Sequence, residues 1–250
     1  MISKNEIKFV TSLHRKKGRE AHHLYIVEGV KLLSEAAHSG AKVTKIFTTD
    51  SSYLSMFVSL ECEKVEISKK DMERITAMNS ASPLLAIIEY EKGSFSIDEL
   101  KQKRFLMLDG LRDPGNLGTI IRSCEWFGIT DIVASEDTVD VFNNKVIQST
   151  MGSFFRVNVH YTDLRIFLQE FAPWKLDFPV YAAVLGGDSL KETLVKENSK
   201  GCVVIGSESH GISENVQSLC SHKITITGSG KAESLNAAIS ASIILYEWFS

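Results

Sequence analysis

The chain has 250 residues, of which 44% are hydrophobic, and its net charge is −3 at neutral pH. This length and apolar content allow a buried core in one large or two smaller domains, and they exclude an intrinsically disordered chain. The longest apolar stretches, such as ASIILYEWF, are shorter than the roughly 20 residues of a membrane-spanning helix, and the start of the chain lacks the apolar core of a signal peptide. We therefore expect a cytoplasmic protein with no membrane partner.

Basic side chains are concentrated at the start of the chain. Residues 1–31 carry seven Lys or Arg against three Asp or Glu, a local charge of +4 in a chain whose total is −3. Because phosphate contacts depend on clustered charge, this segment indicates either a surface that contacts a polyanion or a solvated helix face. The candidates for this contact are Arg15, Lys16, Lys17 and Arg19.

The first part of the chain alternates extended and helical patterns. Residues 25–27 predict a strand and residues 31–38 a helix closed by Gly40. The stretch AKVTKIFTTD is β-branched and predicts a strand, SKKDMERITAM predicts a helix capped by Ser68, and PLLAIIEY predicts a buried strand. We expect a small domain over residues 1–95, followed by a charged linker over residues 96–103.

From residue 104 onward, strands and helices alternate. The strands are predicted in RFLMLDGL, ITDIVAS, VYAAVL, CVVIGS and KITIT, and the helices in PGNLGTIIRSCEWFG and SLNAAISASIILYEWF. This alternation is typical of a parallel sheet covered by helices, so the fold class is α/β over residues 104–250. In the second helix Ser234 suits the N-cap position and places Asn236 in the first turn.

The stretch TITGSGKAESLN suggests a nucleotide-binding loop but does not fit one. A P-loop requires G-x-x-x-x-G-K-[ST], in which the hydroxyl holds magnesium. Around Gly230 and Lys231 the first required glycine is replaced by Thr225, and the hydroxyl position is Ala232. The loop therefore indicates another ligand. The four cysteines are scattered without metal-ligand spacing, so reduced thiols and no metal site are expected.

Three segments carry polar side chains at strand ends, where ligands of open α/β sheets gather. They are LDGLRDPGNLGTIIRSCEWFG with Asn116 and Arg122, VVIGSESHGIS with Glu208, and ITITGSGKAESLNAAIS with Ser234 and Asn236. Taken alone, Ser234 and Asn236 could simply satisfy backbone donors of the helix. Together, the three segments resemble in order and spacing the motifs of the SpoU (TrmH-like) family of RNA ribose 2'-O-methyltransferases, in the SPOUT superfamily.

The resemblance covers residues 104–250, and NKVIQSTMGSFFRVNV is similar to the family's segment between its first two motifs. The first domain resembles the family's small RNA-binding domain, an α/β fold like that of certain ribosomal proteins. The resemblance implies a trefoil knot near the carboxyl end, a homodimer whose subunits complete each other's site, and S-adenosylmethionine as cofactor. The implied cofactor contacts are Gly206, Ile226, Leu235, Ala183 and Val184.

The resemblance also implies a catalytic set, which comprises Asn116, Arg122, Glu208, Ser234 and Asn236. Methyl transfer to a ribose hydroxyl needs alignment and removal of one proton, and no metal. Arg122 is expected to bind a phosphate and stabilise the developing alkoxide, with Glu208 pairing with it and orienting it. The chain departs from the family where its third motif usually reads Ile-Pro-Met, since Thr227 and Gly228 follow Ile226.

We expect an S-adenosylmethionine-dependent methyltransferase that acts on the ribose of structured RNA, either rRNA or tRNA. Two alternatives belong to other classes of protein. One is an RNA-binding protein of the same fold that has lost catalysis, and the other is a P-loop NTPase. Titration with the cofactor distinguishes the first alternative, because an inactive binder should produce no heat.

Overall fold

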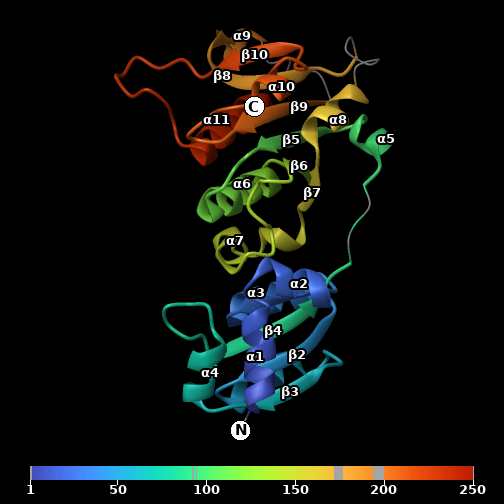
Figure 1. Cartoon of the computed structure of the whole chain (residues 1–250), viewed down its shortest axis with the longest axis vertical. Helices are drawn as coiled ribbons and strands as arrows, with labels where there is room; N and C mark the ends of the chain where they lie inside the picture. The colour runs from blue at the N-terminus through green and yellow to red at the C-terminus, as the bar shows by residue number, and fades with distance from the viewer. Residues whose placement is uncertain (1, 92, 94, 172–176, 194–199, 250) are drawn as a thin grey trace. The chain divides into compact units, whose positions relative to one another are not determined.

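The computed structural model describes residues 2–91, 93, 95–171, 177–193 and 200–249. The chain divides into two compact units, and each contains one β-sheet (Figure 1). The N-terminal unit consists of residues 1–92 and 140–156, and the C-terminal unit consists of residues 93–139 and 157–250. Within the described ranges, no helix is both long and apolar enough to cross a membrane.

The N-terminal unit has a four-stranded mixed sheet in the order β1-β4-β2-β3. Strand β4 is antiparallel to both β1 and β2, and β3 is parallel to β2. The strands are β1 (Leu24–Glu28), β2 (Val43–Thr48), β3 (Glu63–Glu66) and β4 (Leu84–Glu89). The helices are α1 (Lys4–Ser12), α2 (Lys16–His22), α3 (Val30–His38), η1 (Ser51–Phe57), α4 (Lys69–Ile75), α7 (Asn144–Thr150) and η2 (Ser153–Phe155).

Helices cover both faces of this sheet because successive strand residues point to opposite sides. Ile26 and Phe47 pack with α1 and α4 on one face, whereas Tyr25 and Ile46 pack with α3 and η1 on the other. The elements predicted in this part of the sequence are present. Ser68 caps α4 by accepting a hydrogen bond from a backbone N–H, as the sequence predicts.

The C-terminal unit has a six-stranded sheet in the order β10-β8-β9-β5-β6-β7, and all five strand pairings are parallel. The predicted α/β fold with a parallel sheet is confirmed. The strands are β5 (Arg104–Asp109), β6 (Asp131–Ser135), β7 (Asn158–Thr162), β8 (Val180–Ser189), β9 (Gly201–Gly206) and β10 (His222–Thr225). The helices are α5 (Ile97–Leu100), α6 (Pro114–Trp126), α8 (Leu164–Gln169), α9 (Leu190–Thr193), α10 (Glu214–Gln217) and α11 (Ala237–Phe249).

Alternate residues of the central strands build the core of this unit. Phe105 and Met107 of β5 and Val204 of β9 pack with α8 and α10 in one cluster. Helices α6 and α11 lie against each other, with the Ser123 and Ser242 hydroxyls 2.8 Å apart. The carboxyl ends of β5 and β9, which carry the motif residues, therefore lie next to each other because these strands are paired in register.

The unit boundaries differ from the predicted ones in two places. The predicted linker contains α5, which is capped by Ser96, and Leu100 is buried in the core of the C-terminal unit. The segment 140–156 groups with the N-terminal unit, where Ile147 packs among the residues around β1 and β4. Contacts distant in sequence decide both assignments, so the local polarity that suggested the linker was misleading.

A buried polar cluster surrounds Asp131 at the start of β6. The carboxylate accepts hydrogen bonds from Lys103 Nζ at 2.6 Å, Thr130 Oγ1 at 2.7 Å and His160 Nε2 at 2.9 Å. Burial by itself would raise the pKa of Asp131, but the hydrogen bonds from His160, Lys103 and Thr130 and the Lys103 charge outweigh it. The pKa of Asp131 therefore lies well below its ordinary value.

Acid is expected to remove part of the stability of the C-terminal unit through Asp131. Because its folded pKa is depressed, the carboxylate stabilises the fold above the unfolded pKa of about 4, and this contribution is lost as pH falls toward the folded pKa. Asp131→Asn should lower the free energy of unfolding near neutral pH by about 2 kcal/mol and flatten its dependence on pH between about 5 and 2. Urea unfolding measured across that range tests this, with the exposed Asp98→Asn as control.

Candidate functional site

A tight turn follows β9 and presents Glu208. Ser207 and Gly211 exchange two backbone hydrogen bonds of 3.1 and 2.9 Å, and the His210 N–H donates to Ser207 Oγ at 3.2 Å. Gly211 has a φ of +66°, a conformation that favours glycine. The turn is thereby closed on itself, and Glu208 at its tip is exposed.

The carboxylate of Asp109, at the end of β5, anchors the chain that leaves this turn. Its Oδ2 accepts a hydrogen bond from the Ser213 N–H at 2.7 Å. Asp109 is not among the site residues predicted from the sequence. The sequence signal that could have identified it is an acidic residue at the carboxyl end of a buried strand, because ligands of such sheets gather there.

Helix α6 brings Asn116 to the same place. Asp113 caps the helix by accepting from the Asn116 N–H at 2.8 Å, and Pro114 occupies the first turn, which confirms the helix opening expected from the sequence. The Asn116 side chain donates from Nδ2 to Glu208 Oε1. The first and second motifs are thus joined by a hydrogen bond between residues 92 positions apart.

Asn236, rather than Ser234, caps α11, which corrects the sequence-based expectation. Asn236 Oδ1 accepts from the N–H groups of Ala238 at 3.0 Å and Ile239 at 3.3 Å, and the helix begins at Ala237. Its Nδ2 donates to Asn116 Oδ1 at 3.0 Å. Ser234 lies two residues before the cap and is exposed. One amide side chain therefore ends the loop and connects it to the first motif.

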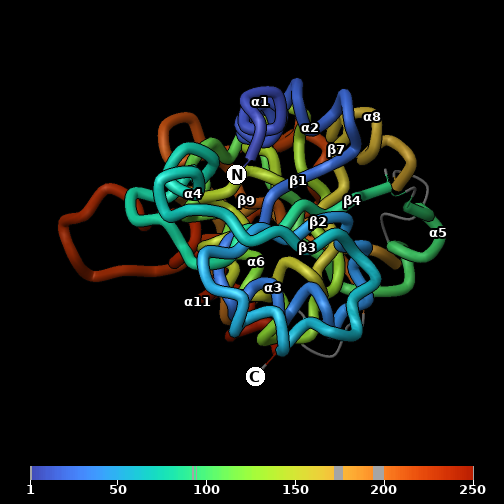
Figure 2. Tube along the Cα trace, turned by 90° about the horizontal axis from the view of Figure 1, so that it is seen from below, coloured from blue at the N-terminus to red at the C-terminus, as the bar shows by residue number. Residues whose placement is uncertain are grey.

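A cavity of about 790 Å³ is lined by the second and third segments, and the first segment reaches it through the hydrogen bond from Asn116 to Glu208. Its lining includes every residue predicted to contact the cofactor, namely Ala183, Val184, Gly206, Ile226 and Leu235, and also Glu208 and Ser234. The apolar side chains of Leu190, Ile205 and Ile244 contribute further walls. The segment 226–236, between β10 and α11, extends away from the rest of its unit in two perpendicular views (Figures 1 and 2).

Within a single chain, Arg122 is not part of the hydrogen-bonded group formed by Asn116, Glu208 and Asn236. Its side chain is exposed and has no ion pair or hydrogen bond with any described residue, and Glu208 is bonded to Asn116 instead. The expected pairing of Glu208 with Arg122 is therefore not present. The reason is helical geometry: six residues place Arg122 about 9 Å farther along α6 than Asn116 and about 120° away around the axis.

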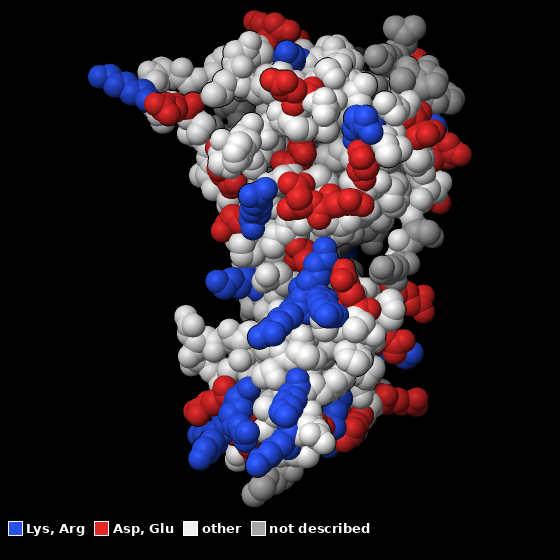
Figure 3. All heavy atoms as spheres, in the orientation of Figure 1, with Lys and Arg blue, Asp and Glu red and all other residues white. Residues whose placement is uncertain are grey.

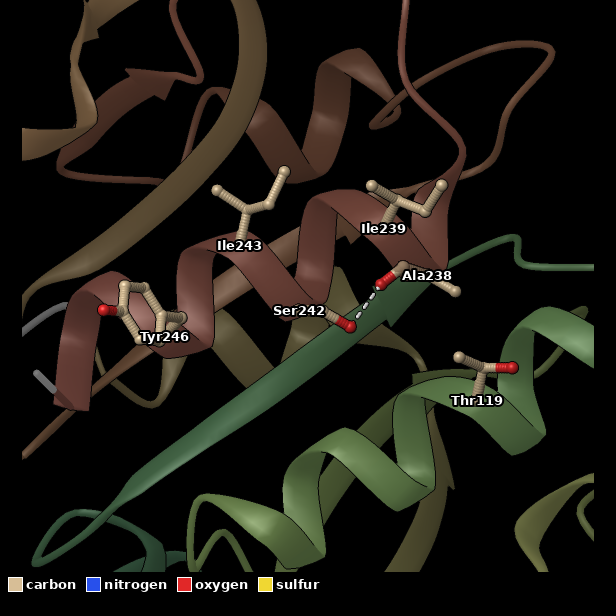
Figure 4. Close-up of a pocket in the computed structure, with 6 residues that line it drawn as sticks. All are labelled: Thr119, Ala238, Ile239, Ser242, Ile243 and Tyr246. Carbon is tan, nitrogen blue, oxygen red and sulfur yellow. Dashed lines mark hydrogen bonds between the residues drawn. The ribbon is translucent and has the colours of Figure 1, made fainter.

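Arg122 instead lies toward an exposed apolar face formed by α6 and α11, because Thr119, Arg122 and Trp126 follow helical spacing. Figure 4 shows Ile239, Ile243 and Tyr246 along one side of α11, with Thr119 on the neighbouring α6. These side chains line a shallow hollow of about 310 Å³. Trp126 is 86% exposed and Tyr246 is 60% exposed, which is unusual for side chains of this size.

The basic residues predicted to contact RNA have two different environments. Arg15, Lys16 and Lys17 at the start of α2 are exposed. Arg19 is only 3% exposed, forms an ion pair with Asp140 and donates to the carbonyls of Leu13 and His14. The assignment of Arg19 to an RNA-contacting surface is therefore wrong, since its guanidinium is buried and already bonded.

The described residues contain no group of three or more His, Cys, Asp or Glu side chains that could hold a metal ion. All four cysteines are free thiols. Cys124 and Cys202 are fully buried, and burial raises the pKa of both thiols, which keeps them protonated.

Two family descriptions match the chain. The SpoU rRNA Methylase family matches residues 103–246, and the MRM3-like substrate binding domain matches residues 4–86. The first match spans more than half of the chain and includes all three motif segments.

Among known proteins, the chain is 26% identical over 246 residues to the 23S rRNA (guanosine(2553)-2'-O)-methyltransferase RlmP of Bacillus subtilis (strain 168), covering 98% of this chain and 96% of the relative. The structure is similar to that of a TrmH-family protein from Porphyromonas gingivalis, with a TM-score of 0.87, 33% identity and coverage of 99% and 98% of the two chains. It is also similar to an AdoMet-bound rRNA methyltransferase from Sinorhizobium meliloti, with a TM-score of 0.84, 25% identity and coverage of 99% and 96%.

Proposed function

The chain belongs to the SpoU rRNA methylase family, and from this premise we propose that it methylates the ribose 2'-hydroxyl of structured RNA, with S-adenosylmethionine as donor. The observation that carries the proposal is the connection of the three motifs beside one cavity. The second and third motifs line it, and the hydrogen bonds from Asn236 to Asn116 and from Asn116 to Glu208 join the first motif to them. The substrate class is rRNA or tRNA, and the relative from Bacillus subtilis is named for a 2'-O-methylation of 23S rRNA.

The cavity fits the proposed cofactor in size and in the chemistry of its lining. A volume of about 790 Å³ is within the range of small-molecule sites, and the apolar side chains of its walls suit the adenosine of the donor. Gly206, Ile226 and Leu235 would hold it from the turns, and Ala183 and Val184 from β8. When bound, the donor supplies an electrophilic methyl group on a sulfonium, so the protein needs only to provide position and electrostatics.

Arg122 is proposed to bind a phosphate of the target nucleotide and to stabilise the alkoxide that develops on the 2'-oxygen. A guanidinium suits both tasks because it stays charged and offers several donors, and for the same reason it is a poor general base. Asn116 and Asn236 hold Glu208 in a fixed orientation at the cavity, and Ser234 contributes a hydroxyl to its lining. These roles define the catalytic set proposed for the chain.

Two measurements test the methyltransferase proposal against an inactive RNA-binding protein of the same fold. Calorimetric titration with S-adenosylmethionine should produce heat, and an inactive binder should produce none. Incubation of unmodified rRNA and tRNA transcripts with methyl-labelled donor should then place label on a ribose 2'-oxygen. A chain that binds the donor but labels none of these RNAs would leave the proposed reaction without support. Mapping of 2'-O-methyl groups in RNA from a deletion strain would identify the nucleotide.

A homodimer across the α6–α11 face forms a second part of the proposal. The exposed Trp126, Ile239, Ile243 and Tyr246 supply the aromatic and aliphatic surface typical of an interface core. Arg122 lies toward this face and away from Glu208 of its own chain. We therefore propose that pairing of two copies brings Arg122 of one chain to the site of the other chain and completes that site. A two-fold arrangement would place the same surface on both partners.

Introducing a charge into this face should separate the subunits. Ile243→Asp is expected to convert a dimer into a monomer in analytical ultracentrifugation and to lower methyl transfer strongly, because a carboxylate cannot be buried unpaired. The control is Val58→Asp, since Val58 is 80% exposed in the N-terminal unit, distant in sequence from α6 and α11. A wild-type chain that is fully active as a monomer would contradict the proposed pairing.

A further inference from the structure

Helices α1 and α4 form one continuous outer surface of the N-terminal unit. Their inner sides pack together on the sheet, with Val10 of α1 and Met72 and Ile75 of α4 in the same buried cluster. Their outer sides carry four exposed lysines. Figure 3 shows Lys and Arg side chains gathered over these two helices. We call Lys4, Lys8, Lys69 and Lys70 the α1–α4 lysine surface.

These four lysines are unpaired, whereas Lys42 and Lys45 of the same unit are neutralised. None of the four has a hydrogen bond or ion pair with a described residue. By contrast, Lys42 pairs with Glu89 at 2.8 Å, and Lys45 pairs with Glu6 and with Glu63. The surface therefore retains its positive charge.

The acidic side chains of α1 and α4 do not cancel this charge. Glu6 is engaged by Lys45, and Asp71 is buried, accepts from Ser68 and lies 3.4 Å from Arg74. Glu73 is the exposed carboxylate that remains among the described residues of the two helices. Four free ammonium groups therefore stand against one carboxylate on this surface.

Three of the four lysines are also poorly placed for helix stability. Lys69 and Lys70 occupy the first turn of α4, and Lys4 occupies the first turn of α1. The positive end of the helix dipole lies there, so a cation costs about 0.3 to 1 kcal/mol and a carboxylate would be preferred. The surface is therefore not explained by the stability of its helices.

We propose that the α1–α4 lysine surface binds the phosphate backbone of the RNA substrate. The inference rests on the proposed function, which makes RNA the substrate, and adds a contact surface to the exposed Arg15, Lys16 and Lys17 of α2. Lysine ammonium groups act as flexible point charges on phosphates, so they orient an RNA without reading its bases. The surface positions the RNA on the protein through its phosphates, and other contacts select the base of the target nucleotide.

The test compares two double variants with a control that removes the same charge elsewhere. The variants are Lys4→Gln with Lys8→Gln, and Lys69→Gln with Lys70→Gln, and the control is Arg165→Gln with Lys191→Gln on exposed positions of the C-terminal unit. Affinity for two RNA hairpins of equal length and unrelated sequence is measured between about 50 and 200 mM salt. Each double variant should bind both hairpins more weakly and reduce the slope of log K against log salt by about 2.

Cofactor titration separates this proposal from the proposed function. The double variants should bind S-adenosylmethionine as the wild type does, and the melting temperature should not fall, because all four lysines are exposed and those in the first helical turns disfavour their helices. Unchanged RNA affinity and salt slope in either double variant, or an equal loss in the control, would overturn the lysine surface. A wild-type chain that binds the hairpins through these lysines but transfers no methyl group would refute the proposed function and leave this surface standing.

Discussion

Replacing Arg122 with alanine is expected to lower the rate of methyl transfer by about a hundredfold to a thousandfold, the effect of removing one preorganised donor from a developing negative charge. Binding of S-adenosylmethionine should be nearly unchanged, because Arg122 is exposed and does not line the cavity. Single-turnover transfer to RNA and calorimetric titration of the cofactor measure the two quantities separately.

Two further variants sharpen the test of Arg122. Arg122→Lys keeps the charge but loses the paired donors of a guanidinium, so it should recover only part of the rate. Arg165→Ala removes an exposed arginine from α8 and should retain wild-type turnover. Wild-type turnover in Arg122→Ala would exclude this arginine from the reaction. Loss of cofactor binding in the same variant would instead make its role structural.

Gly206→Ala is expected to deform the turn after β9 and abolish cofactor binding. A Cβ atom at this position would lie closer than 3.0 Å to backbone atoms of Gly211 and Ile212. Backbone cannot rotate aside as a side chain can, so the free energy of unfolding should fall by about 3 kcal/mol. The backbone segments joined by the Ser207–Gly211 hydrogen bonds would separate, and the Glu208 side chain would move away from Asn116. Urea unfolding measures the first effect, and titration with S-adenosylmethionine measures the second.

The matched control is Gly93→Ala, because a Cβ at Gly93 meets no atom within 4 Å. Its stability should stay within about 0.5 kcal/mol of the wild type. Saturating cofactor should stabilise the wild type and the control by about 2.7 kcal/mol at a free concentration of about 100 times Kd, and Gly206→Ala much less. A folded Gly206→Ala protein with wild-type affinity for the donor would show that this turn does not form the cofactor site.

The sequence alone determined most of the strands and the two long helices α6 and α11, because their signals depend on near neighbours. The apolar run RFLMLDGL predicts β5, and Asp113 with Pro114 predicts the start of α6, since capping involves residues only a few positions apart. The parallel sheet followed from the alternation of strands and helices. The order of the three motifs also identified the family, which the match over residues 103–246 confirms.

Features that depend on distant residues were decided by the tertiary structure. Arg19 belongs to a basic stretch in the sequence, but the fold buries it against Asp140, which lies 121 positions away. The N-cap of α11 is Asn236 rather than the predicted Ser234, because Asn236 also donates a hydrogen bond to Asn116, which lies 120 positions away in the sequence. Local patterns determine which elements form because their forces act between near neighbours. Only packing between elements decides which side chains meet, and so which polar groups remain free to bind a ligand.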